Sequence, residues 1–222
     1  MPKFMRPLIE KIVDVKGDGN CGFRAIAESL GLIEESHVMV QRALIQEGRY
    51  NYILKGFYPP KNYSGFAPPD KWLTLPDVGH NVATYYNRPV EEITSLEIGI
   101  SETFFPIRGR PSINPKSHII CLGLIPNHFV LLLLKDDCPI PQSSTEWNNH
   151  KSEEAASWKD EFLDQHDRFR TLMNIERGER SLSSKKDSNQ HNPILCDTPI
   201  KVDEKFEVLA KHEDDLFALD KI

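Results

Sequence analysis

Hydrophobic and polar residues recur along the chain in patterns that predict a mixture of helices and strands. After a glycine-rich stretch at residues 16–20, one helix face is predicted by apolar residues at i, i+3, i+4 and i+7, namely Phe23, Ile26, Ala27 and Leu30. Gly31 is suited to end that helix. Residues 119–125 and 129–134 are apolar runs joined by Pro126-Asn127, which predicts a hairpin buried on both faces.

The remaining patterns are weaker. Residues 9–15 predict a strand or loop that leads into the glycines, and Asp77 is the N-cap candidate of a helix that carries His80 as a packing or capping residue. Further elements are expected as follows: one or two helices over 38–54, a loop over 56–70, and short strands or turns at 88–90, 98–100 and 103–107.

The pattern changes after Pro139. Ser152, followed by two glutamates, predicts the start of a helix whose apolar positions are Trp158, Phe162, Phe169, Leu172, Met173 and Ile175. Residues 181–192 are rich in Ser, Lys, Asp and Asn, so we expect disorder there, with one more short helix over 206–219. Three parts follow: a domain over 1–138, a linker with an amphipathic helix over 139–178, and an acidic, largely disordered tail over 179–222.

Charge and composition exclude several classes of protein. Residues 1–135 carry 15 Lys/Arg against 13 Asp/Glu (+2), and residues 136–222 carry 12 against 20 (−8), which makes nucleic-acid binding unexpected. The longest apolar run, 129–134, is too short to span a membrane, and no signal peptide is evident, so a cytoplasmic or nuclear protein is expected. The four cysteines form no CxxC pair, so neither disulfides nor a metal site is expected, and His118-x-x-Cys121 lacks a second ligand pair.

The candidate chemistry centres on Cys21, which follows the glycine turn and opens the first predicted helix. The unpaired amides and the dipole at a helix N-terminus stabilise a thiolate, and the same amides are suited to bind an oxyanion. A cysteine after a turn is more often a small buried residue than a catalyst, so position alone leaves both interpretations open.

The wider motif resembles the cysteine motif of the OTU (ovarian tumour) family of cysteine proteases. Asp18-Gly19-Asn20-Cys21, followed by Phe23-Arg24-Ala25, carries the resemblance, and Asn127-His128-Phe129-Val130-Leu131 is similar to the histidine motif that the family places at the start of a late strand. The two motifs lie 128 − 21 = 107 residues apart, so the side chains would meet only through folding.

The resemblance implies an α+β fold of the papain-like, OTU type, with a small central sheet flanked by helices and a helical, partly disordered C-terminal extension. Residues 1–138 would be the catalytic domain, a deubiquitinating thiol protease in which His128 activates Cys21 to cleave the isopeptide bond at the C-terminal glycine of ubiquitin or a ubiquitin-like modifier. Gly19 and Asn20 would shape the turn and the oxyanion site. No cofactor is implied, and a monomer is expected.

Two positions depart from the family pattern. Val130 stands where many members carry Asp or Asn to orient the histidine, so Asp18 is the first substitute and Asn127 the second, while Asp18 is equally suited to cap the turn. Gly22 replaces a bulkier residue and is expected to loosen the helix start. With segments 75–80 and 105–108, it makes the chain resemble OTU-like domains of transposon-derived proteins.

Two other functions stay open at this stage. Val130 favours a catalytically weak or inactive OTU-fold module that binds ubiquitin or another protein. A transposon-related accessory or nucleic-acid protein rests on the subtype and is opposed by the charge balance.

Overall fold

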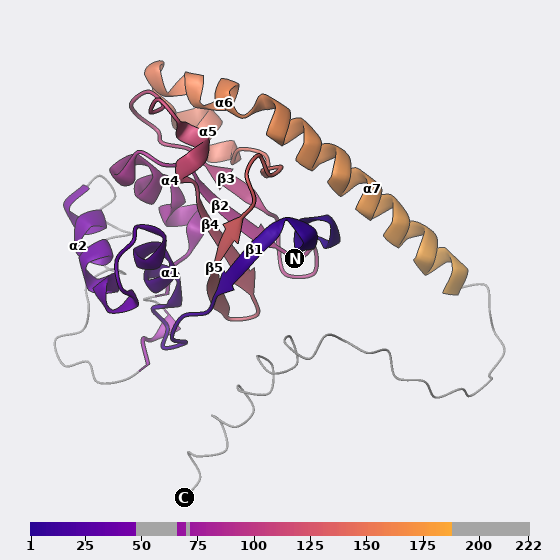
Figure 1. Cartoon of the computed structure of the whole chain (residues 1–222), viewed down its shortest axis with the longest axis horizontal. Coiled ribbons are helices and arrows are strands. Elements are labelled where there is room, and N and C mark those ends of the chain that lie inside the picture. The colour runs from indigo at the N-terminus through magenta and orange to yellow at the C-terminus, as the bar shows by residue number, and fades with distance from the viewer. Residues whose placement is uncertain (48–65, 70–71, 188–222) are drawn as a thin grey trace, which may run out of the picture. The chain divides into compact units, whose positions relative to one another are not determined.

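A computed structural model of the chain describes residues 1–47, 66–69 and 72–187. Its centre is a five-stranded sheet in the order β1-β5-β4-β2-β3 (Figure 1). The strands are β1 (Ile9–Val13), β2 (Val90–Thr94), β3 (Glu102–Phe104), β4 (Ile120–Ile125) and β5 (His128–Leu134). The β2/β4 pair is parallel, and the β1/β5, β4/β5 and β2/β3 pairs are antiparallel.

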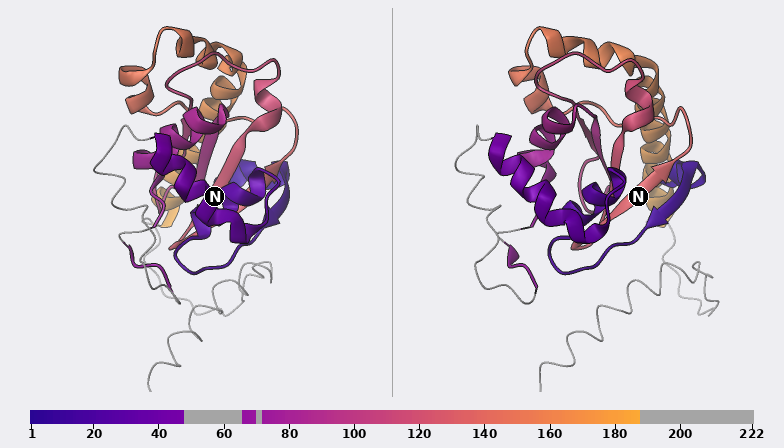
Figure 2. Two further views of the ribbon diagram at one scale, coloured as in Figure 1. Left: turned by 90° about the vertical axis from the view of Figure 1, so that its left-hand side faces the viewer. Right: turned by 60° about the vertical axis from the view of Figure 1, so that its left-hand side comes forward.

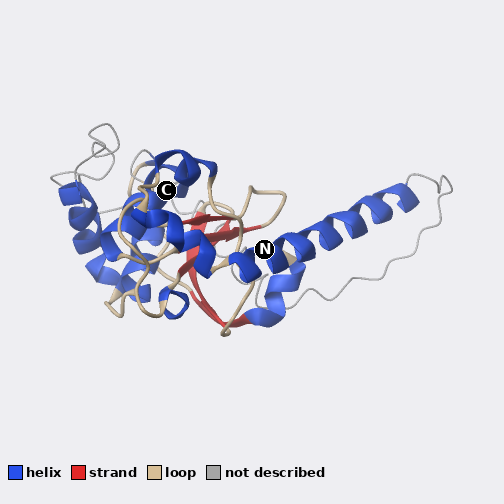
Figure 3. Ribbon diagram, turned by 90° about the horizontal axis from the view of Figure 1, so that it is seen from above, coloured by secondary structure: helices blue, strands red, loops and turns tan. Residues whose placement is uncertain are grey.

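Helices cover both faces of this sheet, as the turned views in Figure 2 and the view from above in Figure 3 show. One face is covered by α1 (Cys21–Ser29), α2 (His37–Glu47) and α4 (Leu75–Tyr86), and the other by η1 (Lys3–Leu8) and α7 (Leu163–Asp187). The shorter helices are η2 (Glu34–Ser36), η4 (Pro115–His118), α5 (Thr145–His150), η5 (Glu154–Ala156) and α6 (Ser157–Glu161). The predicted α+β class, with a small sheet between helices, is confirmed.

Alternation along β4 and β5 explains their continuous apolar runs. Leu122 and Leu131 face the cluster beneath α1 and α4, whereas Cys121 and Val130 face the cluster beneath η1 and α7. Because successive side chains of a strand point to opposite faces, a strand covered on both sides needs apolar residues throughout. The predicted hairpin buried on both faces is therefore confirmed, with His128 as the first residue of β5.

One local prediction differs from the structure. Helix α4 begins at Leu75 with Thr74 as its N-cap residue, three residues before the predicted N-cap Asp77, because Pro76 suits the first helical turn. At residues 98–100 the structure has the end of a turn and no strand, in agreement with the turn that was one of the two expectations there. The predicted second part of the 38–54 helix and most of the loop over 56–70 lie outside the described residues.

The segment after Pro139 packs on the domain. Ser144 caps α5 by accepting a hydrogen bond from the Trp147 amide (3.2 Å), and the helix expected from residue 152 is divided, because Phe162 leaves helical geometry between α6 and α7. The buried side chains that make this third cluster are Phe105, Ile140, Trp147, Ala155, Trp158 and Phe162. Met1–Leu182 forms one compact unit.

His80 of α4 forms hydrogen bonds that connect α4 to this segment. Its Nδ1 lies 2.8 Å from the Phe105 carbonyl oxygen and its Nε2 lies 2.6 Å from Ser144 Oγ, so the expected packing role is confirmed. Helix α7 runs to Asp187, seven residues into the stretch 181–192 where we expected disorder. The expectations for residues 188–222, the 206–219 helix among them, lie outside the described residues. Among the residues described, no helix combines the length and the apolar character needed to cross a lipid bilayer.

Candidate active site

The glycine turn before Cys21 has a fixed shape. Gly19 has φ +80°, in the left-handed region that favours glycine, and a Cβ there would lie 2.6 Å from both the Ala67 carbonyl oxygen and Trp72 Nε1. The Ala67 amide donates to the Asp18 carbonyl oxygen (2.6 Å), and Trp72 Nε1–H donates to the Ala67 carbonyl (2.7 Å). The turn is thus pressed against the segment that precedes α4.

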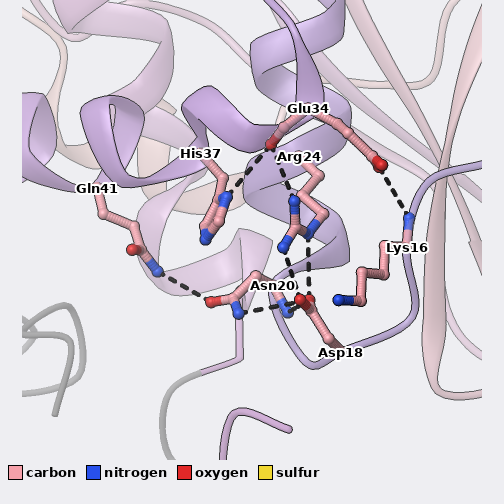
Figure 4. Close-up of polar contacts among 7 residues, drawn as sticks. All are labelled: Lys16, Asp18, Asn20, Arg24, Glu34, His37 and Gln41. Carbon is pink, nitrogen blue, oxygen red and sulfur yellow. Dashed lines mark hydrogen bonds and ion pairs between the residues drawn. The ribbon is translucent and has the colours of Figure 1, made fainter. Parts of the chain in front are cut away.

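Asp18 is fully engaged within the turn (Figure 4). Its carboxylate accepts from Arg24 Nε (3.2 Å) and Nη2 (2.6 Å), and from the Asn20 amide N–H (3.1 Å). Burial alone would raise the pKa of Asp18, but these hydrogen bonds from Arg24 and Asn20 outweigh burial and hold the pKa below its ordinary value. Asp18 therefore stabilises the turn as a carboxylate.

The same network joins the turn to the neighbouring helices (Figure 4). Arg24 Nη1 also donates to the Glu34 carbonyl oxygen (3.2 Å), and the Lys16 amide donates to the Glu34 carboxylate (2.9 Å). Gln41 Nε2 of α2 donates to Asn20 Oδ1 (3.3 Å). The position of Cys21 is consequently set by side chains from α1, η2 and α2.

Cys21 is the first residue of α1 and meets β5 directly. The Phe129 amide donates to Cys21 Sγ over 3.4 Å, which places the sulfur beside the histidine that precedes Phe129. Cys21 is 8% exposed, so its sulfur is reached from the cavity described below and not from an open surface. The structure thus brings together the two residues, 107 positions apart, that the sequence paired.

His128 has a carboxylate partner that the sequence analysis missed. Its Nε2–H donates to Asp14 Oδ1 over 2.9 Å, which leaves Nδ1 for the thiol. Burial alone would lower the pKa of His128, but hydrogen bonding and Coulomb attraction from Cys21 and Asp14 outweigh it and raise the pKa to about 9. The site therefore favours the imidazolium form.

Sheet pairing explains why Asp14 reaches His128. Strand β1 pairs with β5 through Ile12↔Leu132 and Val13↔Leu131, and continuing this register by one residue sets Asp14 opposite Val130. The carboxylate that bonds His128 thus comes from the residue directly after the neighbouring strand, at the level of Val130 in β5. The available signal was an acidic residue near the end of the stretch 9–15, which was predicted as a strand or loop, but its use requires knowing that β1 lies beside β5.

The structure also places the other residues that the sequence analysis singled out near the two motifs. Asn127 has φ +57° in the tight turn between β4 and β5, and Val130 packs in the core beneath η1 and α7. Gly22 is buried, and a Cβ there would lie 2.5 Å from Leu73 Cδ2, so glycine lets Leu73 approach the helix start. Gly22 therefore allows close packing at the helix start, and the expectation that it loosens the helix start is wrong.

A cavity of about 500 Å³ opens over the sulfur. One wall comes from the segment before and at the start of α4, and the other from the ends of β2, β4 and β5. Its lining residues are Cys21, Trp72, Leu73, Thr74, Leu75, Pro76, Glu92, Ile98, Leu124, Ile125, Asn127, His128 and Phe129. The described residues contain no group of three or more His, Cys, Asp or Glu side chains placed to hold a metal ion.

Of the comparisons with known proteins, the one with solved structures gives a match. No protein-family model matches the chain, and no curated protein matches it either. Among solved structures, the chain is similar to the OTU domain of OTUD1, with 19% sequence identity and a TM-score of 0.38 over 60% of this chain and 91% of that chain.

Proposed function

We propose that this protein is a cysteine-type hydrolase whose reacting groups are Cys21, His128 and Asp14. The observation that carries the proposal is the cavity in which the Cys21 sulfur, at the start of α1, lies beside a histidine that is hydrogen-bonded to a carboxylate. A nucleophile, a base and a group that orients the base are the parts that covalent catalysis requires.

The reaction follows from these positions. His128 Nδ1 takes the Cys21 proton, and the thiolate attacks the substrate carbonyl carbon, so that a C–S bond forms and the carbonyl electron pair moves to oxygen. Collapse breaks the C–N bond, and His128 returns the proton to the leaving amine. His128 then removes a proton from water, which attacks the thioester and releases the acid and the thiolate.

Fewer backbone amides are available to bind an oxyanion than the sequence analysis expected. The Asn20 amide is already bonded to Asp18, so it is not free to bind an oxyanion. The Cys21 amide is the first of α1, and such an amide has no partner within its own helix. Cys21 N–H is therefore our candidate donor, while Gly19 and Asn20 shape the turn.

For the substrate we propose the C-terminal tail of ubiquitin or a ubiquitin-like modifier, joined to lysine through an isopeptide bond. The support is the resemblance of 18–25 and 127–131 to the two OTU motifs. Asp14 supplies the orienting group whose apparent absence favoured a non-catalytic binding module. Asp18 contributes to this reaction only indirectly, because it stabilises the turn that positions Cys21.

The test is covalent labelling by ubiquitin that carries a thiol-reactive C-terminal warhead. Wild type is expected to gain one ubiquitin mass, Cys21→Ala to gain none, and His128→Ala to label far more slowly. Cys138→Ala, which removes another buried thiol, is the matched control and is expected to label as wild type does. Stable binding of ubiquitin with no labelling of wild type would favour the binding module, and labelling of Cys21→Ala would contradict the proposed nucleophile.

A further inference from the structure

The β2–β3 loop, residues 95–101, forms part of the wall of the active-site cavity. The Ile98 and Gly99 amides both donate to the Ser95 carbonyl oxygen (3.0 Å each), which makes the loop a compact turn. Ile98 lines the same cavity as Cys21 and is 41% exposed. The position of this loop therefore sets one side of the space that a substrate would enter.

The same loop contacts α7 on the other face of the sheet. Leu96 packs against the cluster beneath η1 and α7, and the Glu97 carboxylate accepts a hydrogen bond from Arg180 Nη1 of α7, with which it forms an ion pair. Arg180 Nη2 also donates to Glu176 Oε1 (3.1 Å), and Glu176 Oε2 accepts from the Lys3 amide (2.8 Å). Arg180 is thus anchored to the body of the protein by one nitrogen and reaches the loop with another.

Both partners of this contact are charged at neutral pH. Hydrogen bonds from Ser95, from its own backbone amide and from Arg180 lower the pKa of Glu97 to about 2, and arginine stays protonated in proteins. The side chains of Arg180 and Glu97 are 33% and 66% exposed, so water weakens their attraction. Ion pairs of this kind change an equilibrium by up to about fivefold, which is a measurable effect.

We propose that Arg180 is a positioning residue for the active-site cavity, because it holds the β2–β3 loop through Glu97 and so fixes Ile98 in the cavity wall. Helix α7 lies beyond residues 1–138, the expected catalytic domain, and would contribute to substrate binding without touching the substrate. The inference rests on the proposed hydrolase, since it takes Cys21 as the source of the reacting sulfur. Losing the ion pair should weaken substrate binding and leave the chemical step unchanged.

The first experiment compares alkylation of Cys21 in the full chain by N-benzyl chloroacetamide and by chloroacetamide, followed by peptide mass spectrometry. Both neutral reagents form a thioether with the sulfur and release chloride, so a change in the reactivity of the thiol cancels in the ratio of their rates. Wild type is expected to react about fivefold faster with the benzyl reagent, whose ring contacts the apolar wall. The ratio should fall to about two in Arg180→Gln and in Glu97→Gln, and no further in the double variant, because both changes remove the same contact. Arg177→Gln, the same substitution at an exposed position of α7, should keep the wild-type ratio.

A wild-type ratio in the two single variants would overturn the role of Arg180, and so would a ratio of one in wild type or a further fall in the double variant. The second experiment measures release of a dye from the ubiquitin C-terminus, for which Arg180→Gln should raise KM about threefold and leave kcat unchanged. A lower kcat at unchanged KM would contradict the proposal. If wild type did not process ubiquitin but the alkylation ratios changed as expected, the substrate would be wrong and the positioning role would stand. Ubiquitin cleavage with neither readout changed in Arg180→Gln would keep the hydrolase and remove that role.

Discussion

Asp14 and Asp18 lie four residues apart and have different partners. Asp14, whose side chain is 53% exposed, bonds the imidazole of His128, whereas Asp18 is mostly buried and bonds Arg24. Replacing the first should change the charge of the reacting pair without disturbing the fold, and replacing the second should disturb the turn that holds Cys21. The two aspartates therefore offer matched variants for separating chemistry from positioning.

The Asp14→Asn variant is expected to lose activity and to change its pH profile. Because Asp14 and Cys21 raise the pKa of His128 to about 9, the imidazolium that protonates the leaving amine persists in wild type until the pH rises through about 9. Without the carboxylate, the pKa of His128 falls and the alkaline decline begins at lower pH. We expect kcat/KM to fall about tenfold or more, measured from pH 6 to 10.5 by release of a dye from the ubiquitin C-terminus.

The control for that experiment is Asp18→Asn, compared by urea unfolding. Since this change leaves Arg24 without its buried partner, we expect a loss of about 3 kcal/mol of stability together with activity, while the alkaline decline stays near pH 9. Asp14→Asn should unfold as wild type does. If the Asp18 variant alone changed the pH profile, Asp18 and not Asp14 would be the orienting group.

At the scale of elements, β2 carries a fully buried acid on the face opposite the cavity. Burial raises the pKa of Glu91 to about 8, and the neighbouring Cys121 thiol only partly offsets this effect. A raised carboxyl pKa means that the stabilising contribution of the protonated form is complete below the ordinary value of 4.5 and is lost as the pH rises through about 8.

Glu91→Gln stays neutral at every pH, so it is expected to raise the Tm over wild type by an amount that grows from pH 5 to pH 9. We expect a gain of about 3 °C or more at pH 9, followed by circular dichroism on heating. Glu10→Gln, at an exposed position of β1, is the control and should show no such growth. A difference independent of pH would contradict an ionising Glu91 as the cause.

Local patterns predicted some elements well and others poorly. The α1 stripe and the β4/β5 hairpin were predictable because their apolar spacing is dictated by burial on one helix face and on two sheet faces. The division between α6 and α7 was not, because Phe162 leaves helical geometry to enter a cluster with Phe105, which is distant in sequence. Asp14 was missed for a similar reason, since the order of strands in a sheet cannot be deduced from the local sequence of any one strand.

For the whole molecule, the segment after Pro139 completes the hydrophobic interior. Trp147, Trp158 and Phe162 are fully buried against Phe105, and His80 bonds Ser144. A chain ended at residue 138 would expose Phe105 and remove Ser144, the partner of His80 Nε2. We expect it to lose cooperative unfolding and labelling by the ubiquitin warhead, whereas a chain ended at residue 182 should retain both, as followed by calorimetry and mass spectrometry. Full labelling of the 1–138 chain would contradict this.

The three side chains that we propose as reacting groups are unevenly distributed along the chain. Asp14 and Cys21 lie seven residues apart, whereas His128 is 107 residues beyond Cys21, on a strand that pairs with β1. A cut in the exposed loop near Ile113, between β3 and β4, would give one fragment with the acid and the nucleophile and a second with the base. Neither fragment would turn over substrate alone, and pairing of β1 with β5 would restore the reaction. With the proposed function, the fold would therefore provide a split enzyme whose catalysis reports the association of any two proteins fused to its halves.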